Sequence, residues 1–254
     1  MKEIFVKGES LPEAYHKSLL ALHNEGDILS CNDWNQKQKE VSMTFVAENP
    51  LAEPMVSRLY IGGFHELQQY VMEVLDGILD FKIGDGTCWE YTYHDRLVNY
   101  NGFDQVNFVV DELKRNSDSR RAVALIRDNK IDPFNEHAAC LQHLQYFVRD
   151  GKLHCKVLMR SNDAAEAAFM NAFAFIMLQK SIAEKLGVGV GSYTHRANSY
   201  HVYEKDFALI EQYVDGIVNK SIEEITFDYE ENYKELMEES ISDILKMVKT
   251  LKEE

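Results

Sequence analysis

The residues best suited to chemistry in this sequence are a cysteine and an arginine placed symmetrically about a turn. Cys140 opens a predicted strand over 141–148, and Arg160 follows a second predicted strand over 153–159. Asp150-Gly151 lies midway between them and is typical of a two-residue hairpin turn. Because equal arms of a hairpin bring their far ends together, we expect Cys140 and Arg160 to be neighbours. A guanidinium beside a thiol stabilises the thiolate, which is the nucleophilic form.

Two other patterns could bind a phosphorylated sugar. Arg120 and Arg121 are adjacent on a short turn before a strand, and such a pair suits a phosphate dianion through forked hydrogen bonds. His201 and Tyr203 alternate along a predicted strand, so their polar ends share one face and could bond a sugar hydroxyl. Taken alone, the arginine pair is weak evidence, because such a pair is more often a solvated surface feature.

The elements that must position these residues alternate between helix and strand. Apolar periodicity predicts helices over 12–24, 62–79, 105–115 and 164–186, and strands over 41–46, 122–126 and 193–203. Gly84 and Gly86, with flanking acids, mark a loop, and Gly187 caps the longest helix. The mixed order with hairpins indicates an α+β fold with a mixed, mostly antiparallel sheet.

The C-terminal part differs in composition from the rest. Residues 1–220 are predicted to form one catalytic domain, and residues 221–254 an acidic amphipathic helical extension. Within the extension, apolar residues recur at helical spacing: Tyr233, Met237, Ile241, Ile244, Leu245, Val248 and Leu251. Such a helix docks either on its own domain or on a partner chain.

Composition excludes several classes of function. The 254 residues include 42 acidic and 27 basic side chains, and the net charge of −15 argues against general nucleic-acid binding. No apolar run is long enough for a membrane helix, and no secretory signal is visible. The four cysteines lack CxxC or zinc-finger spacing, so we expect a reduced, cytoplasmic protein without a metal, in which Cys31, Cys88 and Cys155 are structural.

The region from Asp118 to Phe207 resembles the thymidylate synthase family. The matching pieces keep the family's mutual spacing throughout this region: Asp118-Ser119-Arg120-Arg121, Cys140, Gln145-Tyr146-Phe147-Val148, Asp150-Gly151-Lys152-Leu153, Arg160-Ser161-Asn162-Asp163, Asn171 and His201-Val202-Tyr203. His65-Glu66-Leu67 is similar to the family's glutamate helix. Tyr91-Thr92-Tyr93-His94-Asp95-Arg96-Leu97 is similar to its tyrosine segment, in the form found in short archaeal-type members.

The resemblance implies a thymidylate synthase-like fold, with helices on one side of the sheet and a homodimer formed through the sheet. It also implies transfer of a one-carbon unit from 5,10-methylenetetrahydrofolate, or a related reduced pterin, to C5 of a pyrimidine nucleotide. The leading expectation is conversion of dUMP to dTMP, with Cys140 adding to C6 of the pyrimidine.

The resemblance also assigns roles to individual residues. Arg160 would activate the thiol and touch the phosphate, and Ser161 would hold the phosphate together with Arg120 and Arg121 of the partner subunit. Asn171 would read the pyrimidine edge, and Asp163 would contact the pterin. Glu66 would organise water and shuttle protons, and Tyr93 would help remove the C5 proton. His201 and Tyr203 would bind the 3′-hydroxyl.

The sequence departs from the family pattern at several points. Leu141 follows the cysteine where most members have His, the segment 164–170 is unusual, and Leu79 stands near the usual tryptophan. Lys37 and Lys39 occupy the loop that usually carries a phosphate-binding Arg. The acidic tail replaces the family's short apolar closing tail, so the alternative is a dUMP, dCMP or CMP 5-hydroxymethylase, in which water captures the methylene intermediate. A nucleotide-binding homologue without turnover is a third possibility.

Overall fold

The computed structural model describes residues 1–84 and 89–253, and its centre is one mixed sheet. In the described residues seven strands form this sheet in the order β1-β3-β8-β7-β6-β5, with β2 pairing β3. Their bounds are β1 Glu3–Gly8, β2 Asp27–Cys31, β3 Gln36–Ala47, β5 Val123–Leu125, β6 Leu141–Arg149, β7 Lys152–Asp163 and β8 Gly189–Tyr203. The pairs β1–β3 and β7–β8 are parallel and the others are antiparallel. A separate two-stranded pair joins β4 (Val56–Ser57) to β9 (Thr226–Phe227).

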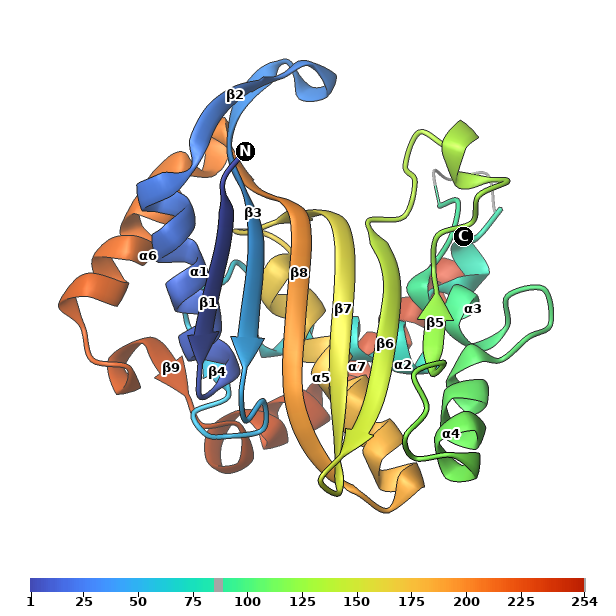
Figure 1. The fold of residues 1–254 in the computed structure, drawn as a ribbon. Coiled ribbons are helices and arrows are strands. Elements are labelled where there is room, and N and C mark those ends of the chain that lie inside the picture. Colours follow the sequence, from blue (N-terminus) through green and yellow to red (C-terminus); the bar gives the residue numbers. More distant parts are fainter. Residues whose placement is uncertain (85–88, 254) are drawn as a thin grey trace.

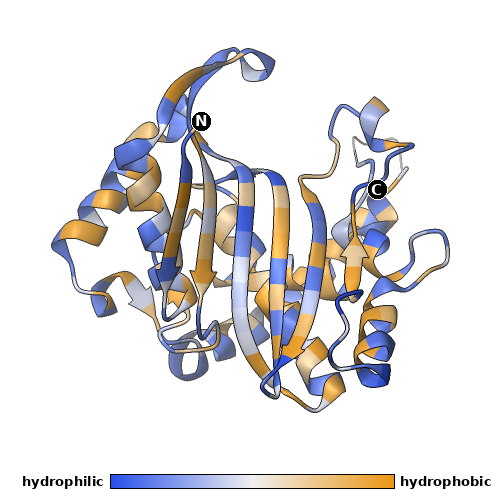
Figure 2. Ribbon diagram, viewed as in Figure 1, coloured by the Kyte–Doolittle hydropathy of each residue, from blue (hydrophilic) through white to orange (hydrophobic). Residues whose placement is uncertain are grey.

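The helices lie on one side of the sheet. They are α1 Leu11–Glu25, α2 Phe64–Asp76, α3 Tyr93–Val98, α4 Gln105–Arg115, α5 Ala168–Leu186, α6 Phe207–Asn219 and α7 Lys234–Glu253. In Figure 1 they lie behind the strands and leave the facing side of the sheet without a helical layer. Figure 2 shows hydrophobic and hydrophilic residues alternating along the central strands, as expected when only one face is buried under helices. The α+β prediction with a mostly antiparallel mixed sheet is confirmed.

The apolar core forms between the sheet and the buried helix α5. Phe169, Phe173 and Phe175 on this helix are at most 1% exposed, and they belong to one cluster with Tyr146 of β6 and Met159 of β7. The predicted helix over 164–186 begins four residues late, at Ala168. The reason is local, because the Asp163 carboxylate accepts the backbone amides of Ala165 (2.9 Å) and Glu166 (3.0 Å) and holds a turn there.

Other predicted elements agree within a few residues, and some elements were missed. The helix over 105–115 is confirmed, whereas the one over 62–79 ends at Asp76, since Gly77 adopts a φ of 63°. Strand β1 and helices α3 and α6 were not predicted. Cys88 and Gly86 lie outside the described residues, whereas Cys155 is fully buried. None of the helices in the described ranges has the length and apolar run needed to cross a membrane.

The C-terminal stripe forms the single helix α7, which packs on the chain's own fold. Met237 is 1% exposed and joins the main core, and Ile244 and Val248 pack against helix α2 through Met72. Leu245, in contrast, is 48% exposed and lies outside the buried stripe.

Candidate active site

The β6–β7 hairpin brings Cys140 and Arg160 together, as their positions on either side of the turn predict. Asp150 and Gly151 both adopt positive φ, 49° and 70°, as the central residues of a tight hairpin turn do. From this turn the antiparallel pairing runs to His143 opposite Leu158, and after a register shift between Leu141 and His143 it places Leu141 opposite Met159. One residue further, the Arg160 amide donates to the Cys140 carbonyl at 2.7 Å. The predicted neighbours are therefore adjacent through their backbones.

The Arg160 guanidinium also holds the segment that leads into the cysteine. Its Nε donates to the Ala139 carbonyl at 3.1 Å, and its Nη2 donates to the Ala138 carbonyl at 2.7 Å. These two bonds use two of the five guanidinium N–H groups. The side chain is exposed, so the other N–H groups can bind an anion that reaches this edge of the sheet.

Burial and the charge of Arg160 have opposite effects on the pKa of Cys140. Burial raises the pKa of the Cys140 thiol, and the charge of Arg160 lowers it by a smaller amount. Arg160 thus acts in the predicted direction, but burial outweighs it, and the thiol in the protein alone titrates above its ordinary range. An anionic ligand does not lower the pKa of the thiol. The thiol therefore has to lose its proton to a base or as the sulfur bonds to carbon.

Tyrosines surround the cysteine. The Tyr93 hydroxyl accepts the amide of Leu141 at 3.4 Å, and its ring packs on Tyr91 and Phe175. The pKa of Tyr91 is raised to about 12, chiefly by burial and next by the nearby Cys140. Burial also raises the pKa of Tyr93 well above its ordinary value, so this phenol stays protonated near neutral pH. Of these tyrosines, the sequence had assigned a role only to Tyr93.

Asn171 on α5 belongs to a buried chain of hydrogen bonds. Its Nδ2 donates to the Tyr70 hydroxyl at 2.6 Å, and its Oδ1 accepts from Asn162 Nδ2 at 3.2 Å. Asn162 Oδ1 lies 2.8 Å from His195 Nε2, and His195 Nδ1 lies 2.8 Å from the Tyr193 hydroxyl.

The chain fixes which way the Asn171 amide points. Burial lowers the pKa of His195 to about 3, so the ring is neutral. Because Asn162 Oδ1 can only accept, His195 Nε2 carries the proton and Nδ1 accepts from Tyr193. Asn171 keeps one N–H and one oxygen lone pair beyond its two protein bonds, which is the donor and acceptor set that a uracil edge requires. Asn162 and His195 were missed because only the fold brings them together.

Ser161, His201 and Tyr203 lie at the ends of β7 and β8, on the same edge of the sheet as Cys140. Ser161 Oγ lies 3.4 Å from His201 Nδ1, and the His201 ring packs edge-on against Tyr203 with centroids 4.8 Å apart. The predicted pairing of His201 with Tyr203 is therefore present. Asp163 pairs with His201 in the β7–β8 register, and burial raises the pKa of this carboxyl, which is occupied by the turn after β7.

Glu66 lies at the N-terminus of α2. Its Oε2 accepts the Gly63 amide at 2.9 Å, which caps the helix, and backbone hydrogen bonds lower the pKa of its carboxyl. Glu66, Tyr70 and Glu73 follow each other at four- and three-residue spacing and so share one helix face. The structure records no direct contact between Glu66 and Cys140.

Arg120 and Arg121 lie far from Cys140 within one chain. The Arg120 carbonyl accepts Gln145 Nε2 at 3.0 Å, and Arg121 Nε donates to Glu112 at 3.2 Å. Gln145 is five residues along β6 from Cys140, which corresponds to about 17 Å of strand. Both arginines are exposed. This chain alone therefore does not bring them to its own cysteine.

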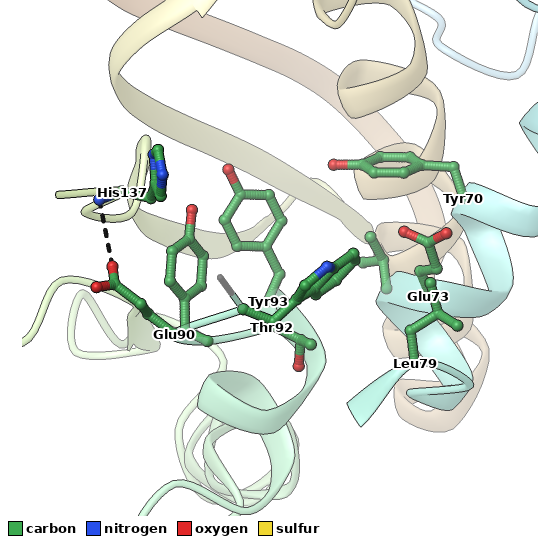
Figure 3. Close-up of a pocket in the computed structure, with 10 residues that line it drawn as sticks. Tyr70, Glu73, Leu79, Glu90, Thr92, Tyr93 and His137 are labelled. Atoms are coloured by element: carbon green, nitrogen blue, oxygen red, sulfur yellow. Dashed lines mark hydrogen bonds between the residues drawn. The ribbon is translucent and has the colours of Figure 1, made fainter. Parts of the chain in front are cut away.

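A cavity of about 390 Å³ lies beside the cysteine, between α2 and the segment that enters α3. Its lining residues are Tyr70, Glu73, Val74, Leu79, Trp89, Glu90, Tyr91, Thr92, Tyr93 and His137. Figure 3 shows Tyr70 and Glu73 reaching it from α2, and Glu90 accepts the His137 amide at 3.2 Å on the other side. Burial raises the pKa of Glu73. Aromatic walls and one half-buried carboxyl suit a flat, nitrogen-rich ring system.

Sequence reasoning named Leu79 near this cavity but missed Glu73, Trp89 and His137. The only available signal was Trp89, a tryptophan just before the tyrosine segment. Among the described residues no group of three or more His, Cys, Asp or Glu is arranged to hold a metal ion.

Comparison with known proteins identifies the class to which this fold and site belong. The family profile for thymidylate synthase matches residues 64–247. A protein of Methanocaldococcus jannaschii, provisionally named a thymidylate synthase, is 32% identical over 218 residues, which cover 82% of this chain and 95% of the relative. Thymidylate synthase of Bacillus mojavensis is 30% identical over 59% of this chain and 52% of its own length. The solved structure of thymidylate synthase A from Bacillus subtilis superposes with a TM-score of 0.66 over 81% of this chain and 84% of that chain, at 20% identity.

The chain belongs to the thymidylate synthase family. It is therefore an enzyme of the class that transfers a one-carbon unit to C5 of a pyrimidine nucleotide.

The opposing effects on Cys140 can be measured by alkylation. We expect Cys140 to react with iodoacetamide along a pH profile whose midpoint lies above that of an ordinary cysteine, because burial disfavours the thiolate. Arg160→Gln removes the opposing charge and moves the midpoint further up, so the rate at pH 8 falls. Peptide mass spectrometry follows Cys140 separately, with Cys31 on β2 as internal control. A midpoint that stays or falls in Arg160→Gln would contradict this account.

Proposed function

We propose that the protein is a cytoplasmic, homodimeric enzyme that converts dUMP to dTMP with 5,10-methylenetetrahydrofolate or a related reduced pterin. Two observations carry the proposal: Arg160 bonds to the backbone of Cys140, and Tyr70, which lines the cavity of about 390 Å³, accepts a hydrogen bond from Asn171 and lies near Cys140. A thiol, an anion-binding guanidinium and an oriented amide match the C6 carbon, the phosphate and the O4/N3–H edge of one nucleotide.

The cysteine side of the site performs the covalent step. Cys140 Sγ bonds to C6 of the pyrimidine, the C5–C6 double bond opens, and C5 becomes the carbon nucleophile. Release at the end breaks the same C–S bond after C5 has lost its proton. Tyr93 keeps its own proton, since burial raises its pKa, so it orients a water that takes the C5 proton and does not act as the base itself. Glu66, at the head of α2, organises that water and shuttles the proton.

The polar residues at the strand ends bind the nucleotide. Arg160 and Ser161 hold the phosphate together with Arg120 and Arg121 of the partner subunit, and His201 and Tyr203 bond the 3′-hydroxyl. The Asn171 amide, held by Asn162 and Tyr70, pairs with O4 and N3–H of uracil. Cytosine reverses donor and acceptor at both positions, whereas a carboxyl group at 171 would suit its amine.

The cavity fits the one-carbon carrier. Most of its walls, including Leu79 and Trp89, are aromatic or aliphatic, and the half-buried Glu73 offers a carboxyl to ring nitrogens. Asp163 contacts the pterin at the cysteine end. When bound, the reduced folate supplies the one-carbon unit and the hydride that completes a methyl group.

Substrate competition tests the chemistry. Purified protein is incubated with 5,10-methylenetetrahydrofolate and dUMP, dCMP, UMP or CMP, and the products are identified by mass spectrometry. We expect dTMP from dUMP, and a kcat/KM about ten- to hundredfold lower for a cytosine nucleotide, because two buried groups on Asn171 would be mispaired. Cys140→Ser should bind dUMP but yield no product.

Each departure from this result has a definite meaning. A 5-hydroxymethyl product would replace the methyltransferase by the hydroxymethylase. A comparable kcat/KM for dCMP or CMP would refute the base assignment, and equal values for UMP and dUMP would refute the sugar assignment. Near-normal turnover by Cys140→Ser would refute the nucleophile.

Subunit mixing tests the shared site. The distance of Arg121 from Cys140 along the chain motivates a site completed by the partner subunit's Arg121. Arg121→Ala and Cys140→Ala homodimers should each be inactive. After exchange, half of the dimers are mixed and each has one intact site, so about a quarter of wild-type activity should return. No recovery under conditions of proven exchange would contradict a site shared in this way.

A further inference from the structure

The C-terminal helix α7 builds a second, small apolar cluster that is separate from the main core. Its buried members are Met72 of α2, Leu79, and Ile244 and Val248 of α7. Ile241 and Met247 of the same helix pack against it, as do Ile78, Phe81 and Trp89. The cluster therefore joins α7 to the segment that follows α2.

Two residues of this cluster also form walls of the cavity. Leu79 and Trp89 line it, and both pack toward α7. Leu79 is only 5% exposed, and it belongs both to the cavity lining and to the apolar cluster. Helix α7 itself supplies none of the lining residues.

The described part of the wall segment, residues 77–84, contains a 3-10 turn. This turn is η2 (Asp80–Lys82), which follows Gly77 at the end of α2. On one side Asp80 accepts the Thr92 hydroxyl at 2.5 Å and lies 2.6 Å from His94 Nδ1, which ties the turn to α3. On the other side Lys252 of α7 lies 5.0 Å from the centre of the Phe81 ring. The segment is thus held between α3 and α7.

We infer that α7 is a positioning element of the carrier site, in which Ile244 and Val248 hold Leu79 and Trp89 against the ring system of the bound carrier. The inference rests on the proposed function for the identity of that ligand. Because Ile244 acts through Leu79 and not on the ligand, its removal should loosen the cavity wall and leave Cys140 and the nucleotide-binding strand ends in place. The acidic helix thereby acts from behind the cavity wall.

The experiment compares two neighbouring positions on α7. Ile244 is fully buried in the cluster, whereas Leu245 beside it is 48% exposed, so Leu245→Ala is a matched control for Ile244→Ala. Ile244→Val is a conservative variant that keeps most of the packing. Each protein is assayed with methylenetetrahydrofolate and dUMP for kcat, for the folate KM and for the dUMP dissociation constant. Its tryptophan emission is compared with that of the wild type, in which Trp34, far along the chain from α7, contributes in the same way, so that the difference reports on Trp89.

The expected pattern is specific to the carrier. In Ile244→Ala the folate KM should rise about tenfold, with kcat and dUMP affinity within about twofold of wild type. Its emission should shift to longer wavelength, Ile244→Val should recover most of the folate KM, and Leu245→Ala should match wild type.

Three results would overturn the inference. One is a folate KM in Ile244→Ala equal to that of Leu245→Ala, measured while the wild type turns over dUMP. This result would leave the proposed function unaffected. Another is an equal loss of carrier and dUMP affinity, which would mean that α7 supports the fold in general. A wild-type protein with no turnover of any pyrimidine nucleotide would overturn the proposed function and this inference together.

Discussion

The site depends on one buried ion pair that joins the tyrosine segment to the loop before the cysteine. Arg96 of α3 makes two parallel bonds to Asp132, at 2.8 and 2.7 Å, and donates a third to the carbonyl of Ile126 at 2.8 Å. Both side chains are at most 2% exposed, and Tyr91 and Tyr100 lie over the guanidinium at 4.7 and 5.5 Å. The pair thus fixes the start of α3, the end of β5 and the approach to Cys140 relative to each other. Breaking such a pair by removing one partner costs about 3–5 kcal/mol, because a charge is left buried without a counterion.

This constraint explains how a half-buried thiol and a set of tyrosines share one site. Burial raises the pKa of Cys140 and of Tyr93, so both hold their protons until substrate is present. For Asp132, burial favours the neutral acid, but the hydrogen bonds and charge of Arg96 outweigh it and lower the pKa, so the pair stays ionised near neutral pH. The ionised Arg96–Asp132 pair thus supports a site in which Cys140 and Tyr93 are protonated and uncharged. Arg160 adds a cationic group beside the backbone of the cysteine.

The parts of the site that sequence predicts are those governed by local rules. The turn at Asp150-Gly151 sets the β6–β7 register, and counting from it places Cys140 within one residue of Arg160. A register shift between Leu141 and His143, which counting does not reveal, brings the two residues opposite each other. The alternation of β8 likewise places His201 beside Tyr203. The Asn162–His195 bond, the Arg96–Asp132 pair and the cluster that contains Leu79 and Ile244 join residues from separate elements. No local pattern specifies which of these elements pack together. The start of α5 was predicted too early because the apolar pattern does not reveal that the Asp163 side chain holds a turn.

The central claim is that Cys140 Sγ bonds to C6 of the pyrimidine while the carrier occupies the neighbouring cavity. Mass spectrometry of the protein incubated with 5-fluoro-dUMP and 5,10-methylenetetrahydrofolate tests it most directly. Fluorine at C5 cannot leave as a proton does, so the reaction should stop with nucleotide and carrier both attached to the enzyme. We predict a mass increase equal to the two together, mapped to the peptide that contains Cys140 and absent from Cys140→Ser. An adduct on another residue, or no adduct on protein that turns over dUMP, would contradict the account.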